Sequence, residues 1–215
     1  MKLIIYGAAN PEIVKLVDAI NGEKKKWDII GFLDDVKEGQ VDSYMDYPIL
    51  GGEGMIEKYR DQGCCFINNV FGTTQNRRLV TDKLDKYQVN YATLISPKVD
   101  TRYVQIGADC TVLDGVFLGM KVSIGNHVGI RANSSINHDT VVEEYVFVGP
   151  GVTVCGKVKL GKGSYIGAGA VIKDGLTIGA WSTIGMGSIV NRDVRKGDVV
   201  AMPPAKSVKS LIAQK

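Results

Sequence analysis

His138 and Gly156 lie eighteen residues apart and are of the types that acyl transfer to an amine requires. A neutral imidazole can accept the proton of an attacking amine. A backbone N–H that no side chain covers can stabilise the oxygen that gains charge when a thioester is attacked. The chain has one other histidine, His127, so few residues are candidates for the base. Whether His138 meets Gly156 depends on the period of the chain around them.

A six-residue repeat sets that period. Fifteen consecutive hexads, from Val104 to Asp193, all have Ile, Val or Leu in third place, and the first place is small or β-branched except at Leu176. Such self-similarity is typical of a solenoid, and a period of six predicts a β-helix. First and third positions share one face of an extended segment, so we expect them to fill the interior, with corners at the polar or glycine positions that follow. Three hexads per triangular coil give five coils.

The coil predicts which residues stack on one another. Residues eighteen apart lie roughly 4.8 Å from each other, the spacing between strands of a sheet. His138 is then expected directly above Gly156, with Asp174 one coil further, so that a side chain and a bare N–H face the same groove. His127 occupies a different corner and stacks over Tyr145. For His127 we expect packing at the surface or in a trimer interface, with a second role in an intersubunit groove left open.

Residues 1–95 carry a different pattern, in which short apolar runs alternate with stretches of helical spacing. This order predicts a parallel sheet with right-handed crossovers in a small α/β, Rossmann-like domain. We expect three parts: this domain over 1–95, the β-helix over 96–203 and a C-terminal tail over 204–215. The predicted strands are 2–7, 27–35, 64–72 and 90–96, and the predicted helices are 11–22, 52–63 and 75–87.

Composition excludes several classes of protein. With 45% hydrophobic residues and a net charge of +3, the chain shows no excess of basic residues that would indicate nucleic-acid binding. The apolar run at the N-terminus is too short for a signal peptide or a membrane span, which makes a cytoplasmic location the default. The four cysteines form no CxxC pair, so reduced thiols are expected. Two histidines are too few for a three-histidine zinc site such as that of the γ-type carbonic anhydrases.

The repeated [Ile/Val/Leu]-Gly-x-x-[Ser/Ala/Val] run resembles the hexapeptide-repeat acyltransferases, which implies a left-handed parallel β-helix and usually a homotrimer. More narrowly, the segments YGAAN, GFLDD, INHD, VCG and PPAK resemble the bacillosamine-type sugar N-acyltransferases over nearly the whole chain. This resemblance implies transfer of acetyl from acetyl-CoA, without metal, to a nucleotide-linked amino sugar, most simply a UDP-linked 4-amino-4,6-dideoxy sugar, for glycan biosynthesis. The alternatives are an O-acetyltransferase of the same repeat class, acting on a sugar or another small acceptor, and a non-catalytic protein on the same scaffold.

The resemblance also implies roles for residues near the corner. Matched to the INHD motif, His138 is the base, Asp139 is the carboxylate that orients it, and the Gly156 N–H meets the acetyl carbonyl. Adjacent residues of a strand point to opposite faces, so Asp139 reaches His138 only if the chain bends there. For acetyl-CoA the matched positions are the backbone at Ala168 and Met186, with Lys173 near the phosphates. A column of outward aromatic residues, Phe147 and Tyr165, is expected to form a trimer contact.

The nucleotide sugar is assigned by the same resemblance to the first domain. The turn after the first predicted strand supplies Gly7 and Asn10, but it lacks the GxGxxG motif of nicotinamide-binding domains. Asp34 and Asp35 follow the second predicted strand, where ligands of parallel sheets gather, although a solvated acidic turn is an equal alternative. Arg131, seven residues before His138, is the fifth candidate. Three residues depart from the family pattern and bear on which sugar is bound, namely Pro11, Arg131 and Phe147.

Overall fold

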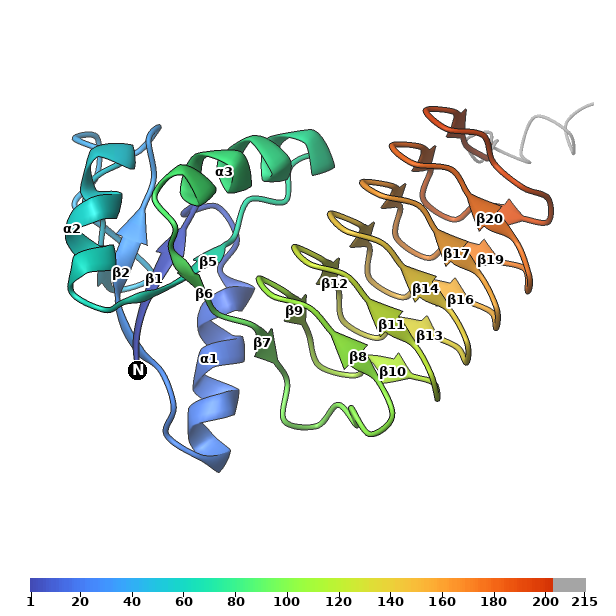
Figure 1. Ribbon diagram of the computed structural model, residues 1–215, viewed down its shortest axis with the longest axis horizontal. Coiled ribbons are helices and arrows are strands. Elements are labelled where there is room, and N and C mark those ends of the chain that lie inside the picture. Colours follow the sequence, from blue (N-terminus) through green and yellow to red (C-terminus); the bar gives the residue numbers. More distant parts are fainter. Residues whose placement is uncertain (203–215) are drawn as a thin grey trace, which may run out of the picture.

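Residues 1–202, which the computed structural model describes, form an α/β unit followed by a three-sided parallel solenoid (Figure 1). The tail predicted at 204–215 lies outside these residues. The first unit, here called the N-terminal unit, contains β1 (Lys2–Tyr6), α1 (Glu12–Glu23), β2 (Asp28–Leu33), β3 (Ser43–Tyr44), β4 (Tyr47–Pro48), the 3-10 helix η1 (Glu53–Met55), α2 (Ile56–Asp61), β5 (Cys65–Asn68), α3 (Thr74–Lys86) and β6 (Asn90–Tyr91).

The N-terminal unit is built on a four-stranded parallel sheet in the order β2-β1-β5-β6. The central strand β1 alternates its side chains between two cores. Leu3 and Ile5 pack in the cluster that includes α1, whereas Ile4 and Tyr6 pack in the cluster that includes α2 and α3. Because both faces of β1 are covered, its sequence is a continuous apolar run, as is usual for a parallel sheet between helices. The three predicted helices and the first three predicted strands are confirmed.

The strand predicted over 90–96 is wrong, because the chain bends in the middle of this segment. Its first part, β6, pairs with β5 in the N-terminal unit, and its second part, β7 (Leu94–Ile95), pairs with β9 in the solenoid. Of the two residues between them, Thr93 donates a hydrogen bond from its hydroxyl to the carbonyl of Gly107 at 2.9 Å. The apolar run therefore belongs to two sheets and joins the two units.

The solenoid has three parallel sheets, which we name after their first strands: the β7 sheet of seven strands, and the β8 and β10 sheets of five strands each. Stacked strands pair eighteen residues apart, as Ser135 with Thr153 shows, which confirms the predicted period. First and third hexad positions fill one continuous core. After β7, the strands are β8 (Gln105–Ile106), β9 (Thr111–Val112), β10 (Phe117–Leu118), β11 (Ser123–Ile124), β12 (Gly129–Ile130), β13 (Ser135–Ile136), β14 (Val141–Val142), β15 (Phe147–Val148), β16 (Thr153–Val154), β17 (Lys159–Leu160), β18 (Tyr165–Ile166), β19 (Val171–Ile172), β20 (Thr177–Ile178), β21 (Thr183–Ile184), β22 (Ile189–Val190) and β23 (Val199–Val200).

Each coil turns at the sixth position of its hexads, where the backbone is left-handed, with φ of +57° at Asp139 and +61° at His127. We name the three corner columns after one member each. The His138 corner joins the β10 sheet to the β8 sheet, the His127 corner joins the β8 sheet to the β7 sheet, and the Ala168 corner joins the β7 sheet to the β10 sheet. The turns place the fifth and sixth residues of each hexad side by side at an edge of the three-sided solenoid.

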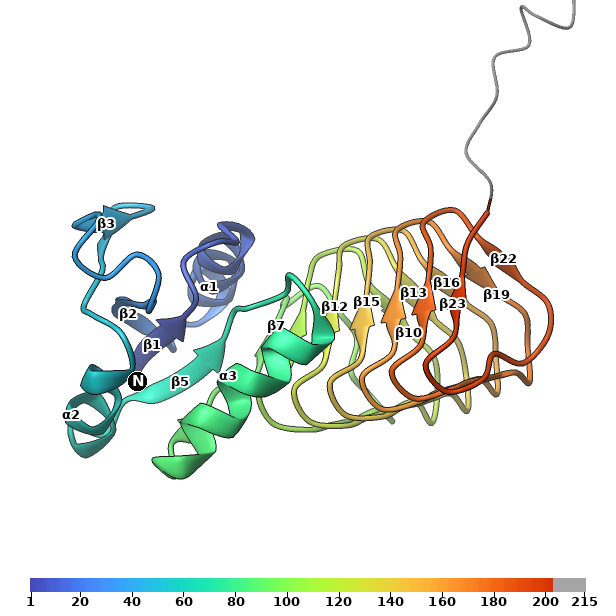
Figure 2. The ribbon, with the colours of Figure 1, turned by 90° about the horizontal axis from the view of Figure 1, so that it is seen from above.

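The N-terminal unit packs on the β7 sheet and on the His127 corner of the solenoid. Phe71 packs on Phe147 of that sheet at 5.9 Å between ring centroids, and α3 reaches the His127 corner through a hydrogen bond from Thr74 to Gly163. Figure 2 shows α3 running alongside the first coils. In a three-sided solenoid the His138 corner is opposite the β7 sheet. It therefore lies on the far side of the solenoid from the N-terminal unit.

Candidate active site

His138 and Asp139 form a hydrogen-bonded pair on the open corner of the solenoid. The imidazole Nδ1 lies 2.9 Å from Oδ2 of Asp139. The two side chains are 59% and 42% exposed, so both are open to a ligand. The left-handed backbone at Asp139, with φ of +57°, gives the bend that a regular strand lacks. The adjacent residues predicted to work together thus face each other.

The hydrogen bond with Asp139 fixes which nitrogen of the His138 ring carries the proton. The hydrogen bond with His138 is the main cause that holds the pKa of Asp139 below its usual range, so this carboxyl group is ionised and accepts the bond. The donor must then be the Nδ1–H of His138. In the neutral ring this leaves the lone pair on Nε2, which points away from the carboxylate. A ring held in this tautomer is arranged to accept a proton at Nε2.

Gly156 lies directly under the ring of His138, as the repeat predicts. A Cβ atom added at Gly156 would come within 2.6 Å of His138 Nε2, a distance that no real contact allows. Among residues 1–202, no acceptor takes the Gly156 N–H. Fifth-position N–H groups are free at most corners of the solenoid, so the free N–H alone does not mark a site. What distinguishes Gly156 is that the imidazole lone pair lies against a backbone that carries no side chain, and the ring itself buries this glycine.

A cavity of about 510 Å³ opens at the carboxyl ends of β1, β2 and β5 in the N-terminal unit. Gly7, Asp34 and Asp35 line it, as expected for ligand-binding residues at that edge of a parallel sheet. Gly7 has φ of +102°, and a Cβ there would come within 2.7 Å of the Val70 side chain, so the turn requires glycine. The remaining lining, which sequence analysis missed, consists of Tyr6, Ala9, Val36, Lys37, Val70, Phe71, Gly72, Asn76, Leu79 and Val80.

The two aspartates in this cavity are held by the protein itself. Asp34 accepts hydrogen bonds from the N–H groups of Ala8, at 2.7 Å, and of the two residues 36 and 37 in the next turn, at 3.0 Å each. Burial alone would raise the pKa of Asp35, but hydrogen bonds from Lys83 and Tyr6 outweigh it and hold that pKa below its usual value. Neither side chain is the freely solvated turn residue that was the alternative. Asp34 holds the turn at the edge of the cavity. Asp35 links Tyr6, which lines the cavity, to Lys83 of α3.

Asn10 and Arg131 pair beside the cavity. With the Asn10 amide oxygen facing the guanidinium, it accepts a hydrogen bond from Arg131 Nη1 at 2.9 Å. The guanidinium carbon lies 4.2 Å from the centroid of the Phe71 ring, and burial lowers the pKa of Arg131 to about 10. Phe71 also lines the cavity, so Arg131 supports its wall. All five predicted acceptor-binding residues are thus gathered at or next to one cavity.

Phe147 was expected to be exposed in a trimer contact, and this is wrong. The side chain is 9% exposed because Phe71 and Arg131 of the same chain lie over it. It stacks on Tyr165 at 4.9 Å between ring centroids, one coil away, so the predicted aromatic column exists. The repeat identifies the outward face of the strand but not what packs on that face.

The three residues expected to bind acetyl-CoA lie on two different edges. Ala168 and Met186 stack at the Ala168 corner, and within residues 1–202 neither N–H has a protein acceptor. Met186 is 78% exposed. Lys173 follows β19 and lies instead on the side of the His138 corner, where its side chain is exposed. One protomer therefore does not bring Lys173 together with the other two.

His127 was expected to pack at the surface or in a trimer interface. The structure instead buries it within the chain. Its side chain is 10% exposed and stacks on Tyr145 at 4.8 Å between centroids. Its Nδ1 lies 3.0 Å from Oδ2 of Asp109, which is fully buried and also pairs with Arg77 at 3.1 Å. Arg77 extends from α3 and donates to the carbonyls of His127 and Asn68. This buried network joins the N-terminal unit to the solenoid.

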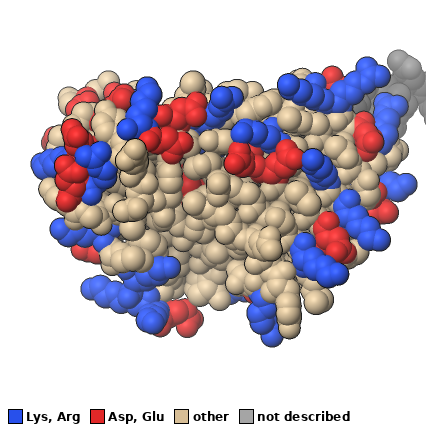
Figure 3. Space-filling view, viewed as in Figure 1, with Lys and Arg blue, Asp and Glu red and all other residues tan. Residues whose placement is uncertain are grey.

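Three further observations concern surface charge, membrane-spanning helices and metal sites. Lys and Arg are interspersed with Asp and Glu around the rim of the face in Figure 3, while uncharged side chains occupy its middle. No helix within the described residues is both long enough and apolar enough to cross a membrane. Over the same part of the chain, no three side chains of His, Cys, Asp or Glu gather as they would around a metal ion.

Comparison with known proteins identifies the repeat and the fold. The family model for bacterial transferase hexapeptide (six repeats) matches residues 157–192. No curated protein matches the chain. A solved structure of GDP-perosamine N-acetyltransferase from Caulobacter crescentus, a histidine-to-alanine mutant with CoA and GDP-perosamine, superposes with a TM-score of 0.85 at 21% identity, covering 96% of each chain.

Two further structures resemble this chain over similar lengths. The acetyltransferase domain of PglB from Neisseria gonorrhoeae in complex with acetyl coenzyme A has a TM-score of 0.83 at 24% identity, covering 95% of this chain and 98% of that one. WeeI from Acinetobacter baumannii has a TM-score of 0.80 at 24% identity, covering 96% and 99%. At these identities the similarity shows a common fold, including the N-terminal unit. The resemblance stated from the sequence is thus confirmed for the repeat and for the architecture.

Proposed function

We propose that this chain, which carries the bacterial transferase hexapeptide repeat, is an acetyl-CoA-dependent N-acetyltransferase of a nucleotide-linked amino sugar. The observation that carries the proposal is the corner itself, where His138 is paired with Asp139 and lies over the bare backbone of Gly156. The solved structures that share the fold add support, because they include one with CoA and GDP-perosamine and one with acetyl coenzyme A.

In the proposed reaction the amine of the acceptor attacks the thioester carbonyl directly. A C–N bond forms, the C–S bond breaks, and CoA leaves as a thiolate that takes up the proton which His138 received from the amine. His138 takes the proton of the amine at Nε2, while Asp139 holds the ring through Nδ1. The Gly156 N–H stabilises the negative charge on the carbonyl oxygen. A covalent acyl-enzyme is not needed, and within residues 1–202 the free thiol of Cys155 is hydrogen-bonded to no base.

The acceptor binds through its nucleotide in the cavity of the N-terminal unit. The cavity is mostly apolar, as suits a base, and Lys37 and Asn76 supply a cation and an amide at its edge. Because both predicted aspartates are already hydrogen-bonded, we assign them to shaping the cavity, with direct contact to ribose or base as a secondary role. We propose a Rossmann-like nucleotide-binding role for this unit and a 4-amino-4,6-dideoxy sugar as the acceptor, linked to UDP.

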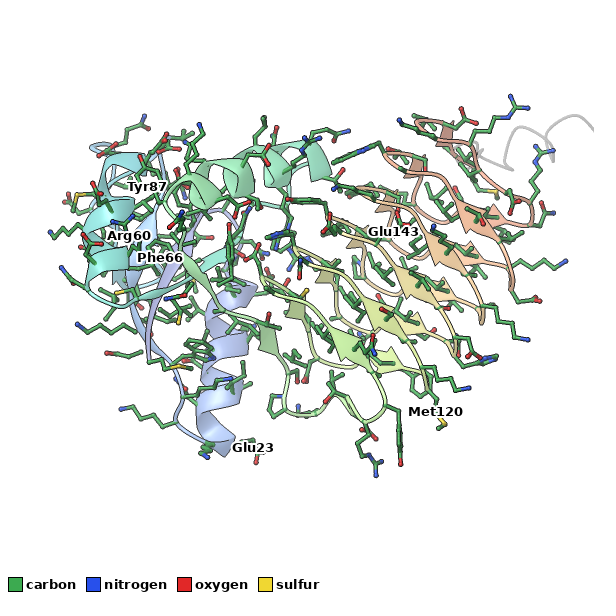
Figure 4. All side chains as sticks on the ribbon, viewed as in Figure 1. Glu23, Arg60, Phe66, Tyr87, Met120 and Glu143 are labelled. Carbon is green, nitrogen blue, oxygen red and sulfur yellow. The ribbon has the colours of Figure 1, made fainter. Side chains whose placement is uncertain are left out.

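The proposed reaction requires more than one protomer. The nucleotide cavity lies on the side of the β7 sheet, and the His138 corner is opposite that sheet. Met120, in the same corner column as His138, points outward from the lower edge of the solenoid in Figure 4, whereas α3 lies along the upper edge. We therefore propose a homotrimer of left-handed β-helices in which the N-terminal unit of one protomer brings the sugar to His138 of the next. The same groove would place Lys173 of one chain near Ala168 and Met186 of another, beside acetyl-CoA. The cytoplasmic location remains a prediction.

A panel assay tests the function. The purified protein is incubated with acetyl-CoA and with UDP-, dTDP- or GDP-linked amino sugars, and release of the CoA thiol is followed beside mass analysis of the product. We expect a mass gain of one acetyl group on the amine of at least one nucleotide sugar. Free sugars, whose hydroxyls an O-acetyltransferase would modify, serve as controls. Acetylation of a free sugar hydroxyl, with none on any nucleotide-linked amine, would contradict the proposal.

A further inference from the structure

Gly129 leaves a gap in the outer face of the β7 sheet. The second place of each hexad points outward, and Gly129 is the one glycine among the residues that hold this place between Val104 and Asp193. Its backbone is not left-handed, so the strand itself does not require glycine. A Cβ atom there would instead overlap the ring of Phe71, which belongs to the N-terminal unit. The missing side chain thus makes room for a residue of the other unit.

The ring of Phe71 is held on this sheet by several neighbours. Its centroid lies 5.9 Å from that of Phe147, which pairs with Gly129 in the next strand. The guanidinium carbons of Arg131 and Arg77 lie 4.2 Å and 4.4 Å from the same centroid, within the range of cation–π contacts. Phe147 and Arg131 belong to the solenoid, and Arg77 belongs to α3. A place for one aromatic ring, here called the Phe71 socket, is therefore built by Gly129, Phe147, Arg131 and Arg77.

Phe71 lies in the middle of the link 69–73, which joins β5 to α3 and borders the cavity of the N-terminal unit. Val70 and Phe71 both line that cavity. The start of the link is tied to the solenoid as well, since the Val70 N–H donates to the Asn68 side chain at 3.0 Å and the Asn68 N–H donates to the Asp109 carboxylate at 2.7 Å. The position of the Phe71 ring therefore sets where this wall of the cavity lies.

We infer that Gly129 is a positioning residue for acceptor binding, because the Phe71 socket holds the cavity wall in the shape that receives the nucleotide. The inference rests on the proposed function for the identity of the ligand. Gly129 does not itself line the cavity and acts through Phe71. A wall that is already in place does not have to be ordered when the ligand binds, whereas each side chain that must be ordered lowers the affinity. The solenoid thus contributes to nucleotide affinity in addition to carrying the base.

A double-mutant cycle in nucleotide binding tests the inference. Kd is measured by calorimetry for whichever of UDP, dTDP and GDP binds the unmodified chain most tightly. Gly129→Ala should raise Kd by about 3- to 10-fold, the cost of ordering one displaced side chain on binding. In a Phe71→Val background, which lacks the ring atoms that the new methyl group would meet, the same change should raise Kd by less than about twofold. Equal factors in both backgrounds would overturn the inference, as would an unchanged Kd in Gly129→Ala alone.

The same variants are compared in steady-state acetyl transfer. In Gly129→Ala, KM for the nucleotide sugar should follow Kd, while kcat at saturating acceptor and KM for acetyl-CoA stay within about twofold. A rise in both KM values would mean a general loss of packing and would contradict the inference. The matched control is Gly22→Ala, whose added Cβ meets no atom within 4 Å and which should change neither KM. If Gly129→Ala does not fold, recovery of the fold in Gly129→Ala/Phe71→Val supports the socket, and failure of both to fold contradicts it.

Hydrogen exchange of the link 69–73 in the ligand-free protein does not depend on the acceptor being known. The Val70 N–H is hydrogen-bonded in the native chain, and its exchange should be faster in Gly129→Ala and unchanged in Gly22→Ala. Equal exchange in the two variants overturns the inference. Failure of the proposed function would appear differently, as no binding of any of the three nucleotides by the unmodified chain while the difference in exchange persists.

Discussion

The molecule contains two histidine–aspartate pairs with almost the same internal geometry and opposite surroundings. Nδ1 of His138 lies 2.9 Å from its carboxylate, and Nδ1 of His127 lies 3.0 Å from that of Asp109. The first pair is open to solvent on a corner that nothing else in residues 1–202 covers, while the second lies under α3 among aromatic rings. Because the pair geometry is shared, it cannot identify the base. The exposure of the His138 side chain and the glycine that lies beneath its ring are what distinguish the candidate site from the buried structural pair.

The largest effect is expected at the buried pair and concerns stability. Arg77→Ala removes the cation that shares the buried Asp109 carboxylate and leaves that charge without its ion pair. Breaking a buried pair in this way typically costs about 3–5 kcal/mol. Urea unfolding should show this loss. The neighbouring Arg78→Ala, whose partner Asp82 is half exposed, should cost about 1 kcal/mol or less. Equal losses of unfolding free energy in the two variants would contradict the structural role of the Arg77–Asp109 pair.

At the open pair, Gly156→Ala should reduce kcat by about 10- to 100-fold. The new methyl group would come within 2.6 Å of His138 Nε2, displacing the ring and covering the N–H that meets the acetyl oxygen. Steady-state kinetics checks the loss, and an unchanged thermal midpoint checks the fold. Cys155→Ala, at the adjacent position, is the matched control and should retain activity. Full activity in Gly156→Ala would remove this glycine from the site.

Asp139→Asn should lower kcat by about 10-fold. The amide can still bond Nδ1, but it no longer selects the tautomer with the lone pair on Nε2 or stabilises the protonated ring. We expect less than in buried triads, since this carboxylate is 42% exposed and water can replace it in part. Asp109→Asn at the other pair should lower stability and leave the kcat of the folded protein within about twofold. A reversed order of the two activities would exchange the roles of the pairs.

The smallest predicted effect is one of slope in the pH profile. Because the folded-state pKa of Asp139 is lowered, its carboxylate is present above its ordinary pKa of about 4 and is lost only as pH falls through the lowered value. The Asp139 carboxyl group should therefore stay ionised between about pH 5 and 8. The acid limb of log kcat/KM should have a slope of one. A slope of two would mean that the carboxyl group also takes up a proton in this window.

The eighteen-residue period accounts for how much of the site could be predicted. It placed His138 over Gly156 and His127 over Tyr145, and the same spacing puts Asp109 next to His127. The period describes the solenoid alone, so it carries no information on side chains that approach from elsewhere. Arg77 and Phe71, which close over the buried pair and the β7 sheet, come from the N-terminal unit.

Two phenylalanines make the same point about outward positions. Phe117 and Phe147 both occupy the second place of their hexads and point away from the core, yet they are 57% and 9% exposed. Within residues 1–202 no other segment packs over Phe117 on the β10 sheet, whereas the β7 sheet carries the N-terminal unit. The hexad predicts direction, and only tertiary packing decides burial. For the same reason the sequence could not predict that Lys37, Asn76 and Leu79 line one cavity.

The most direct test of the central claim compares the two histidines in one assay. Acetyl transfer to the nucleotide amino sugar is measured for His138→Ala and for His127→Ala, each normalised to folded protein. The account predicts that His138→Ala loses at least about 10²-fold in kcat with an unchanged thermal midpoint, because a general base is worth about that much or more. His127→Ala should lower the thermal midpoint and keep kcat near that of the unmodified chain. Wild-type kcat in His138→Ala, or a larger loss of kcat in His127→Ala, would contradict it.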